Sequence, residues 1–139
     1  MVVAVSCATD SGKELLALKK MADESYAAGD WEGSREKYER IAKRAPQDAQ
    51  TWFRLGNIFA RENKLEKAIA CYERSAALEP RFAPAWRNLG VMRLYQAELA
   101  LRASQAVTKE GHPLREGNQR IIDSIKTAIE NGKSDGGGK

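Results

Sequence analysis

Residues 49–82, AQTWFRLGNIFARENKLEKAIACYERSAALEPRF, decide the fold of this chain because their residue classes recur at a spacing of 34. Large, small, aromatic and proline positions match residues 15–48 upstream, and the start of the pattern recurs downstream. The matched positions include Leu18 with Trp52, Ala22 with Gly56, Tyr38 with Tyr72 and Pro46 with Pro80, and Trp86, Leu89 and Gly90 continue the series. A period of this length indicates a repeat architecture.

Each repeat is predicted to hold two helices. In the first repeat, Ser11 and Glu14 have the spacing of a capping box, which predicts the start of a helix. Asp30 is suited to cap the second helix, and Pro46 ends it because the residue before a proline disfavours the helical region. Apolar residues run at helical spacing through the first helix, at Leu15, Leu18, Met21, Ala22 and Tyr26.

The second repeat follows the same scheme. Asp48 is predicted to cap its first helix, Asn63 lies in the turn between its helices, and Pro80 ends it. Gly56 in this repeat and Gly90 in the next are predicted to let two antiparallel helices approach to about 8–10 Å. Both glycines are therefore expected to have a steric role.

The pattern W-x2-L-G, formed by Trp52, Leu55 and Gly56 and followed by an alanine, an aromatic residue and a terminal proline, resembles the tetratricopeptide repeat. The resemblance is strongest in residues 49–82 and extends to residues 15–48. It implies an all-α fold, a right-handed α-α superhelix of antiparallel helix pairs closed by a C-terminal capping helix.

The third repeat, residues 83–112, is atypical. The position 34 residues after Tyr72 is Ala106, and no Gly, Pro, Asn or Asp lies between Gly90 and Gly111. We therefore predict one helix from residue 83 to about residue 109, and the alternative is a helix pair with a shortened turn.

The expected organisation around these repeats has three parts. A flexible segment over residues 1–11 precedes a repeat domain over residues 12–132. That domain ends in a capping helix over residues 113–131, and a disordered tail follows over residues 133–139.

By resemblance to the family, the first helix of each pair lines a concave face that binds a protein or peptide partner. Asparagine can bond a peptide backbone, arginine can hold a carboxylate, and aromatic rings offer apolar area. The alternative is that Phe53 and Tyr95 only pack beneath a neighbouring helix and that the charged residues are solvated. The residues expected to line the face are Lys19, Asp23, Tyr26, Phe53, Asn57, Arg61, Arg87, Asn88, Val91 and Tyr95.

One form of the family binds the C-terminal carboxylate of chaperones through a basic clamp. Lys19 matches a lysine of that clamp, but the other matching positions hold Asp23, Arg54, Pro84 and Asn88 where the family has Asn, Asn, Lys and Arg. An acidic side chain opposes an anion, so binding of chaperone tails is not predicted.

Cys7 follows small apolar residues and precedes a polar spacer, which resembles the end of a bacterial lipoprotein signal. The charged leader and full apolar segment of such a signal do not precede it. A lipidated Cys7 would place the protein at the periplasmic side of the outer membrane, like small repeat lipoproteins of pilus and secretion assembly. Without lipidation, Cys7 is an ordinary thiol and a cytoplasmic location is expected.

Composition narrows the class of function. The chain has 139 residues, is 30% charged and has one histidine and two cysteines, so neither a metal site nor a catalytic constellation is predicted, and no cofactor is expected. The net charge of +4 is too mild for a nucleic-acid binder. We therefore predict a non-enzymatic scaffold that binds a protein segment. The alternatives are a cytosolic chaperone or adaptor for a secreted substrate, and a self-associating structural repeat protein.

Overall fold

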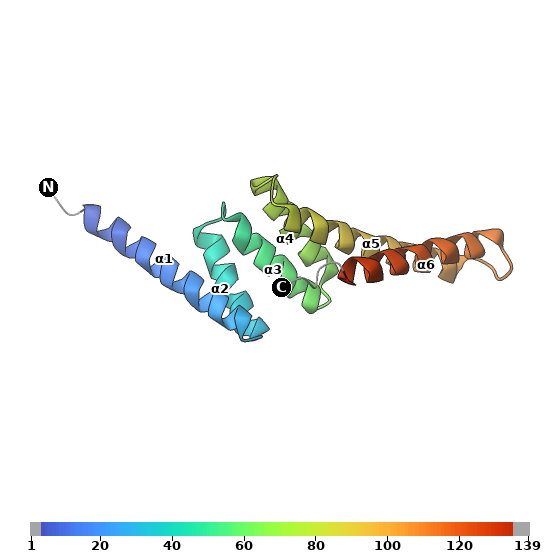
Figure 1. Ribbon diagram of the computed structural model, residues 1–139, viewed down its shortest axis with the longest axis horizontal. Coiled ribbons are helices and arrows are strands. Elements are labelled where there is room, and N and C mark those ends of the chain that lie inside the picture. The colour runs from blue at the N-terminus through green and yellow to red at the C-terminus, as the bar shows by residue number, and fades with distance from the viewer. Residues whose placement is uncertain (1–3, 135–139) are drawn as a thin grey trace. The chain divides into compact units, whose positions relative to one another are not determined.

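The computed structural model describes the backbone of residues 4–134 and the side chains of residues 11–132. The described residues form helices and no strands (Figure 1), as predicted for an all-α fold. None of the helices described is both long enough and apolar enough to span a bilayer. The helices are α1 (Ala4–Ala27), α2 (Trp31–Arg44), α3 (Ala49–Arg61), α4 (Leu65–Leu78), α5 (Ala83–Val107) and α6 (Pro113–Ser134).

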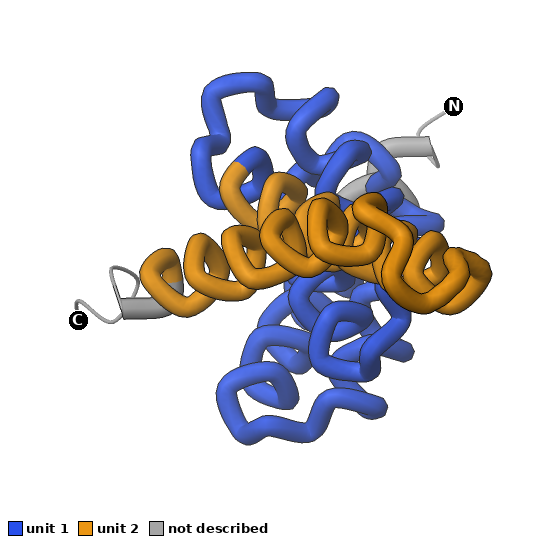
Figure 2. Tube along the Cα trace, turned by 90° about the vertical axis from the view of Figure 1, so that its right-hand side faces the viewer, with its two compact units in different colours: residues 1–86 blue, residues 87–139 orange. Residues whose placement is uncertain are grey.

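The chain divides into two compact units, which Figure 2 shows in different colours. Unit 1, Met1–Trp86, contains the helix pairs α1/α2 and α3/α4, with α2 packed against α3. Unit 2, Arg87–Lys139, contains most of α5 and all of α6.

Hydrogen bonds recur in unit 1 at the predicted spacing. The indole Nε1 of Trp52 donates to the Pro46 carbonyl at 2.9 Å, and Nε1 of Trp86 donates to the Pro80 carbonyl at 3.0 Å. The hydroxyl of Tyr38 donates to Asp23 at 2.5 Å, and that of Tyr72 donates to Asn57 at 2.8 Å. Each second bond lies 34 residues after the first, so the sequence repeat is a repeat of contacts.

The predicted caps and turns of unit 1 are confirmed with one exception. Asp30 accepts from the Gly33 amide at 3.0 Å, and Asp48 accepts from the Gln50 amide at 3.2 Å. The turn at Asn63 has a φ of 56°, in the left-handed region that asparagine tolerates.

The prediction of a capping box at Ser11 is wrong. Helix α1 begins at Ala4, and the Ser11 carbonyl and hydroxyl instead accept hydrogen bonds from Arg44 at 3.3 Å. No proline or glycine lies between Ala4 and Ser11 to stop the helix from extending toward the N-terminus. Residues 4–11, expected to be flexible, are therefore part of α1, and the side chain of Cys7 lies outside the described ones.

Met21 and Gly90 also differ from prediction. Leu55 is buried, whereas its repeat equivalent Met21 is 52% exposed. Leu55 lies on α3, which packs extensively on both α2 and α4, whereas the extensive packing of the described part of α1 is with α2. A Cβ at Gly90 would meet no atom within 4 Å. Its predicted steric role is wrong because the aromatic ring that faces Gly56 has its equivalent in the small side chain of Ala106.

Cys71 belongs to the core of unit 1, as predicted. Its side chain is buried in α4, and this burial raises the pKa of its thiol to about 11. The thiol is therefore protonated at neutral pH and suited to packing.

In unit 2, α5 and α6 form a hairpin. Residues 83–107 are one helix, as predicted, and Gly111 provides the following turn with a φ of 76°. Asn118 of α6 donates to the Ser104 hydroxyl at 2.9 Å, and the Arg115 guanidinium donates to the Gln105 and Thr108 carbonyls at 3.0 and 2.9 Å. Helix α6 continues to residue 134, beyond the predicted end at 131, since no proline interrupts it.

Candidate functional site

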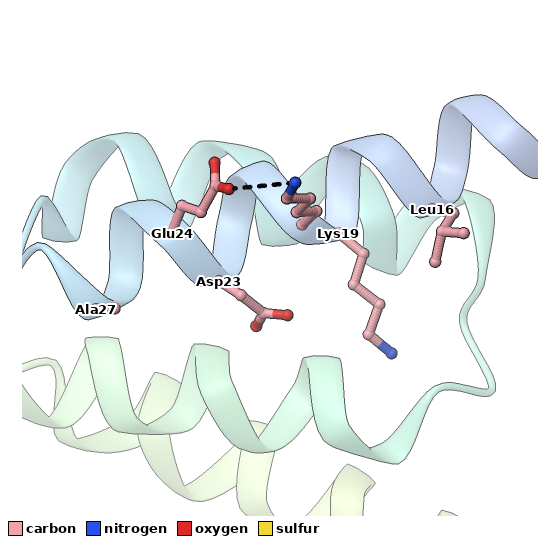
Figure 3. Close-up of a pocket in the computed structure, with 6 residues that line it drawn as sticks. Leu16, Lys19, Asp23, Glu24 and Ala27 are labelled. Carbon is pink, nitrogen blue, oxygen red and sulfur yellow. Dashed lines mark ion pairs between the residues drawn. The ribbon is translucent and has the colours of Figure 1, made fainter.

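A shallow groove of about 650 Å³ runs along one face of α1. Its lining residues recur at helical spacing, three or four positions apart, so they form one stripe on the helix. Figure 3 shows Lys19 and Asp23 pointing from this stripe toward α3, while Glu24 lies at the other edge in an ion pair of 3.8 Å with Lys20. The lining residues are Leu16, Lys19, Lys20, Asp23, Glu24 and Ala27.

Lys19 connects this groove to the start of α3. Its ammonium group lies 2.7 Å from the carboxylate of Asp48, the residue that caps α3. Burial raises the pKa of the Asp48 carboxyl, but hydrogen bonds from Lys19, Thr51 and the Gln50 amide outweigh it, so the pKa lies below its usual value. The ion pair therefore contributes stability only while Asp48 is ionised.

Replacing Lys19 by methionine is expected to lower the free energy of unfolding by about 0.5–1 kcal/mol at neutral pH. Because the pKa of Asp48 is lower in the folded protein, this contribution is present above its unfolded pKa of 3.8 and is lost as the pH falls through the folded pKa. Urea unfolding of both proteins at neutral pH and near pH 2 measures the difference. Lys13→Met, at an exposed position on the same helix, is the control and should show no such dependence. If Lys19→Met lowers the free energy of unfolding equally at both pH values, the stabilising role of the Lys19–Asp48 ion pair is contradicted.

Asn57 is held by hydrogen bonds on both sides of its amide. Its Nδ2 donates to the Tyr26 hydroxyl at 3.1 Å, and its Oδ1 accepts from the Tyr72 hydroxyl at 2.8 Å. These bonds join α1, α3 and α4 through one side chain. Asn57 thus positions Tyr26 with the same atoms that were expected to bind a peptide backbone.

Two arginines of α3 lie over aromatic rings. The guanidinium carbon of Arg54 is 4.6 Å from the Tyr26 ring centre, and that of Arg61 is 4.4 Å from the Trp31 ring centre. Tyr26 and Trp31 themselves meet edge to face, with ring centres 5.3 Å apart. The rings of Tyr26 and Trp31 therefore support the arginine side chains on this side of α3.

Phe53 lies partly buried between other rings. Its ring centre is 5.0 Å from that of Phe82 and 5.9 Å from that of Tyr72. This is the packing role that the sequence left as the alternative for Phe53. It leaves only part of the ring accessible to a partner.

The structure places the predicted residues in two groups. Unit 1 holds six of them, with Lys19 and Asp23 in the groove and Tyr26 bonded to Asn57. Unit 2 holds four on α5: Arg87, Asn88, Val91 and Tyr95. Within unit 2, Arg87 donates to the Gly132 carbonyl of α6.

Sequence reasoning missed several residues of this surface. Leu16, Lys20, Glu24 and Ala27 line the groove, and the helical spacing of Leu16 from Lys19 was a signal that could have found it. In the sequence, Arg54 is distinguished only as a departure from the clamp of the family. Among the described residues, no three His, Cys, Asp or Glu side chains are grouped to hold a metal ion.

The comparisons with known proteins agree with this architecture. The sequence model of the family described as Tetratricopeptide repeat matches residues 19–80. A chloroplastic protein of Arabidopsis thaliana, the tetratricopeptide repeat domain-containing protein PYG7, is 45% identical over 42 residues. That match covers 30% of this chain and 14% of the relative's length.

Solved structures of low sequence identity show the same fold. The TPR2B domain of yeast Sti1, in a complex with pHsp70, is 20% identical with a TM-score of 0.59, covering 84% of this chain and 98% of that one. The type III secretion translocator chaperone SycD of Yersinia enterocolitica is 19% identical with a TM-score of 0.58, covering 87% and 95%. The likeness to these structures is one of fold.

Proposed function

Since residues 19–80 of this chain match the sequence model of the tetratricopeptide repeat family, we propose that unit 1 binds a segment of a partner protein along the groove of α1. The observation that carries the proposal is Leu16, which is 71% exposed and lines the groove beside charged residues of both signs. An exposed apolar anchor with a charged rim is the composition of a protein-binding site. The function proposed is therefore non-enzymatic.

The charges of the groove support an oriented partner. Lys19 and Lys20 lie near Leu16, and Asp23 and Glu24 follow one turn later along α1. A segment with the opposite order of charges is favoured over the reversed one, because like charges would otherwise meet. The yeast domain of the same fold is in a complex with pHsp70, which supports binding of a protein segment as the general mode.

The finer expectations from the sequence remain proposals. The first is lipid attachment at Cys7, in a protein that acts in bacterial pilus or secretion assembly. It predicts that palmitate labels the wild-type protein and does not label Cys7→Ser. The likeness to a secretion chaperone is one of fold, so the role of chaperone for a secreted substrate stands as an alternative. Sedimentation at several concentrations tests self-association.

Selection from a random peptide library displayed on phage tests the proposed groove. Leu16→Glu is expected to lower the affinity for the selected peptides about tenfold, because it places a charge where the proposed binding site has its apolar anchor. The matched control is Met21→Glu, an exposed apolar residue on another face of the same helix, which should change affinity less than about twofold. Isothermal titration calorimetry measures both.

Peptides that bind Leu16→Glu as well as the wild type would rule out the groove as the binding surface. Far-ultraviolet circular dichroism must show the same helix content in both variants, which both replace exposed side chains. A loss of peptide affinity for Leu16→Glu alone, with helix content unchanged, supports the proposal.

A further inference from the structure

One side of α6 carries exposed apolar side chains and no charge. Leu114 is 49% exposed and Ile121 is 51% exposed, and they lie seven residues apart, so they share one side of the helix. A Cβ at Gly117, on the same side between them, would meet no atom within 4 Å. Glycine inside a helix is unfavourable relative to alanine, and close packing among the described residues does not require it here. We call this side the α6 row, and its positions are Leu114, Gly117, Ile121, Ser124 and Ala128.

Helix α5 adds small side chains to the same side of the hairpin. Asn118, which borders the α6 row, donates to the Ser104 hydroxyl of α5, so Ser104 lies beside that row. Ala97 and Ala100 are seven and four residues before Ser104, which places them on its side of α5, and both are exposed. Val107, three residues after Ser104, is 87% exposed. Unit 2 therefore has one continuous face, formed by both helices, that the described side chains leave uncovered.

The two helices of this face match each other in side-chain size and in position along the hairpin. Because they are antiparallel, three residues forward from Asn118 correspond to three residues back from Ser104, which places Ile121 level with residue 101. In helix packing, a large side chain enters a hole formed by four residues at positions i, i+3, i+4 and i+7 of the facing helix. The hole level with Ile121 is formed by Ala97, Ala100, Leu101 and Ser104, and we call it the α5 hole. Three of its four residues are small, so it has room for an isoleucine.

We propose that this face of unit 2 binds a second copy of the chain, with Ile121 of each copy in the α5 hole of the other. A two-fold axis parallel to the helices keeps level residues level, so one rotation forms both contacts. A second copy is favoured over a helix of another protein because the large side chain and the hole that fits it occur on the same face.

The size of the face predicts a weak dimer. Helix α6 has 22 residues, so the face is about 33 Å long and about two helix diameters wide, or on the order of 600 Å² per copy. Stable complexes bury about 800 Å² per partner, so we expect a dissociation constant of about 10–100 µM. The monomer therefore predominates at low micromolar concentration. The groove of α1 lies in unit 1, so this pairing does not depend on the function proposed for that groove.

Sedimentation equilibrium of the full chain, from about 5 to 500 µM, measures the association. Ile121→Glu is expected to weaken it at least tenfold, roughly, because the charge would enter the α5 hole. Ala100→Leu is also expected to weaken it about tenfold, although it adds apolar area, because leucine fills the hole. Leu99→Glu is the matched control and should change the association less than about twofold. Leu99 is 58% exposed but lies about 140° around α5 from Ser104.

Disulfide cross-linking tests which residues face each other. In a Cys7→Ser background, a mixture of Ile121→Cys and Ala100→Cys chains is expected to form a mixed disulfide about tenfold faster than a mixture of Ile121→Cys and Leu99→Cys chains. The reason is that only the first pair of positions lies close across the proposed two-fold axis. Far-ultraviolet circular dichroism at low micromolar concentration shows whether each variant keeps the helix content of the wild type.

Three results would overturn the inference. The first is a chain that stays monomeric over the whole concentration range, which would leave this face to another protein. The second is an Ala100→Leu variant that associates more tightly than the wild type, because non-specific contact between apolar surfaces grows with apolar area. The third is equal cross-linking in the two mixtures of cysteine variants. Loss of association by Ile121→Glu and Ala100→Leu, with Leu99→Glu unchanged, supports the proposed dimer.

Discussion

Replacing Gly56 by alanine is expected to lower the free energy of unfolding of unit 1 by about 2 kcal/mol. An alanine Cβ at this position would lie 2.6 Å from Cε1 and 2.7 Å from Cδ1 of the Tyr72 ring. The ring cannot easily move, because Tyr72 is 2% exposed and its hydroxyl bonds Asn57. Helices α3 and α4 must therefore separate or the ring must leave its site.

Gly90→Ala is the matched control for this change. Gly90 occupies the same repeat position but lies in a helix with open space beyond its Cα. Alanine there is expected to raise the free energy of unfolding by about 0.5–1 kcal/mol, through the lower conformational freedom of the unfolded chain. The two substitutions are thus predicted to have opposite signs.

Urea unfolding measures both effects. Tryptophan fluorescence follows unit 1, because Trp31, Trp52 and Trp86 all lie in it, and far-ultraviolet circular dichroism follows both units. Equal stability of Gly56→Ala and the wild type would show that Tyr72 does not pack on Gly56 in solution. Destabilisation by Gly90→Ala would indicate that the helix face at Gly90 contacts other atoms in solution.

Much of the fold could be predicted because it depends on local chemistry repeated along the chain. The caps at Asp30 and Asp48 follow from residues that lie beside the helix they cap, and the prolines at 46 and 80 follow from backbone geometry. The single helix α5 followed from the absence of turn residues. These signals need no knowledge of what lies across the fold.

The errors occur where the outcome depends on a neighbour distant in sequence. Met21 matches the buried Leu55 but lies on a helix whose extensive packing is with α2, and Gly90 matches Gly56 but lacks the tyrosine. The error at Ser11 is local instead, because it has the spacing of a cap but no proline or glycine between Ala4 and Ser11 ends the helix there. A residue class alone does not reveal which partner is missing.

The same limit applies to the candidate site. Spacing placed Asn57 and Arg61 on the first helix of a pair, where the structure has them. It could not reveal that Asn57 bonds two tyrosines while Arg54, three residues earlier, has a buried Nε with no hydrogen-bond partner among the described side chains. That distinction depends on the side chains of α1 and α4, which approach only in the folded unit.

In unit 2, Ile122→Ala is expected to lower stability by about 2–4 kcal/mol, whereas Ile121→Ala should change it by less than about 0.5 kcal/mol. The two isoleucines are neighbours in α6, but Ile122 is 0% exposed and Ile121 is 51% exposed. The described large apolar side chains that unit 2 buries are few, Leu89, Ile122, Ile125 and Ile129, so loss of one leaves a cavity that little else can fill.

Hydrogen–deuterium exchange with peptide resolution separates a local from a global effect. If unit 2 opens by itself, Ile122→Ala will speed exchange in α6 and in the second half of α5 while α1 to α4 keep the wild-type rate. Ile121→Ala supplies the reference, because it removes the same atoms from the same helix without creating a cavity. Equal acceleration by both variants would mean that the α5/α6 hairpin does not bury Ile122 in solution, since only burial distinguishes the two positions.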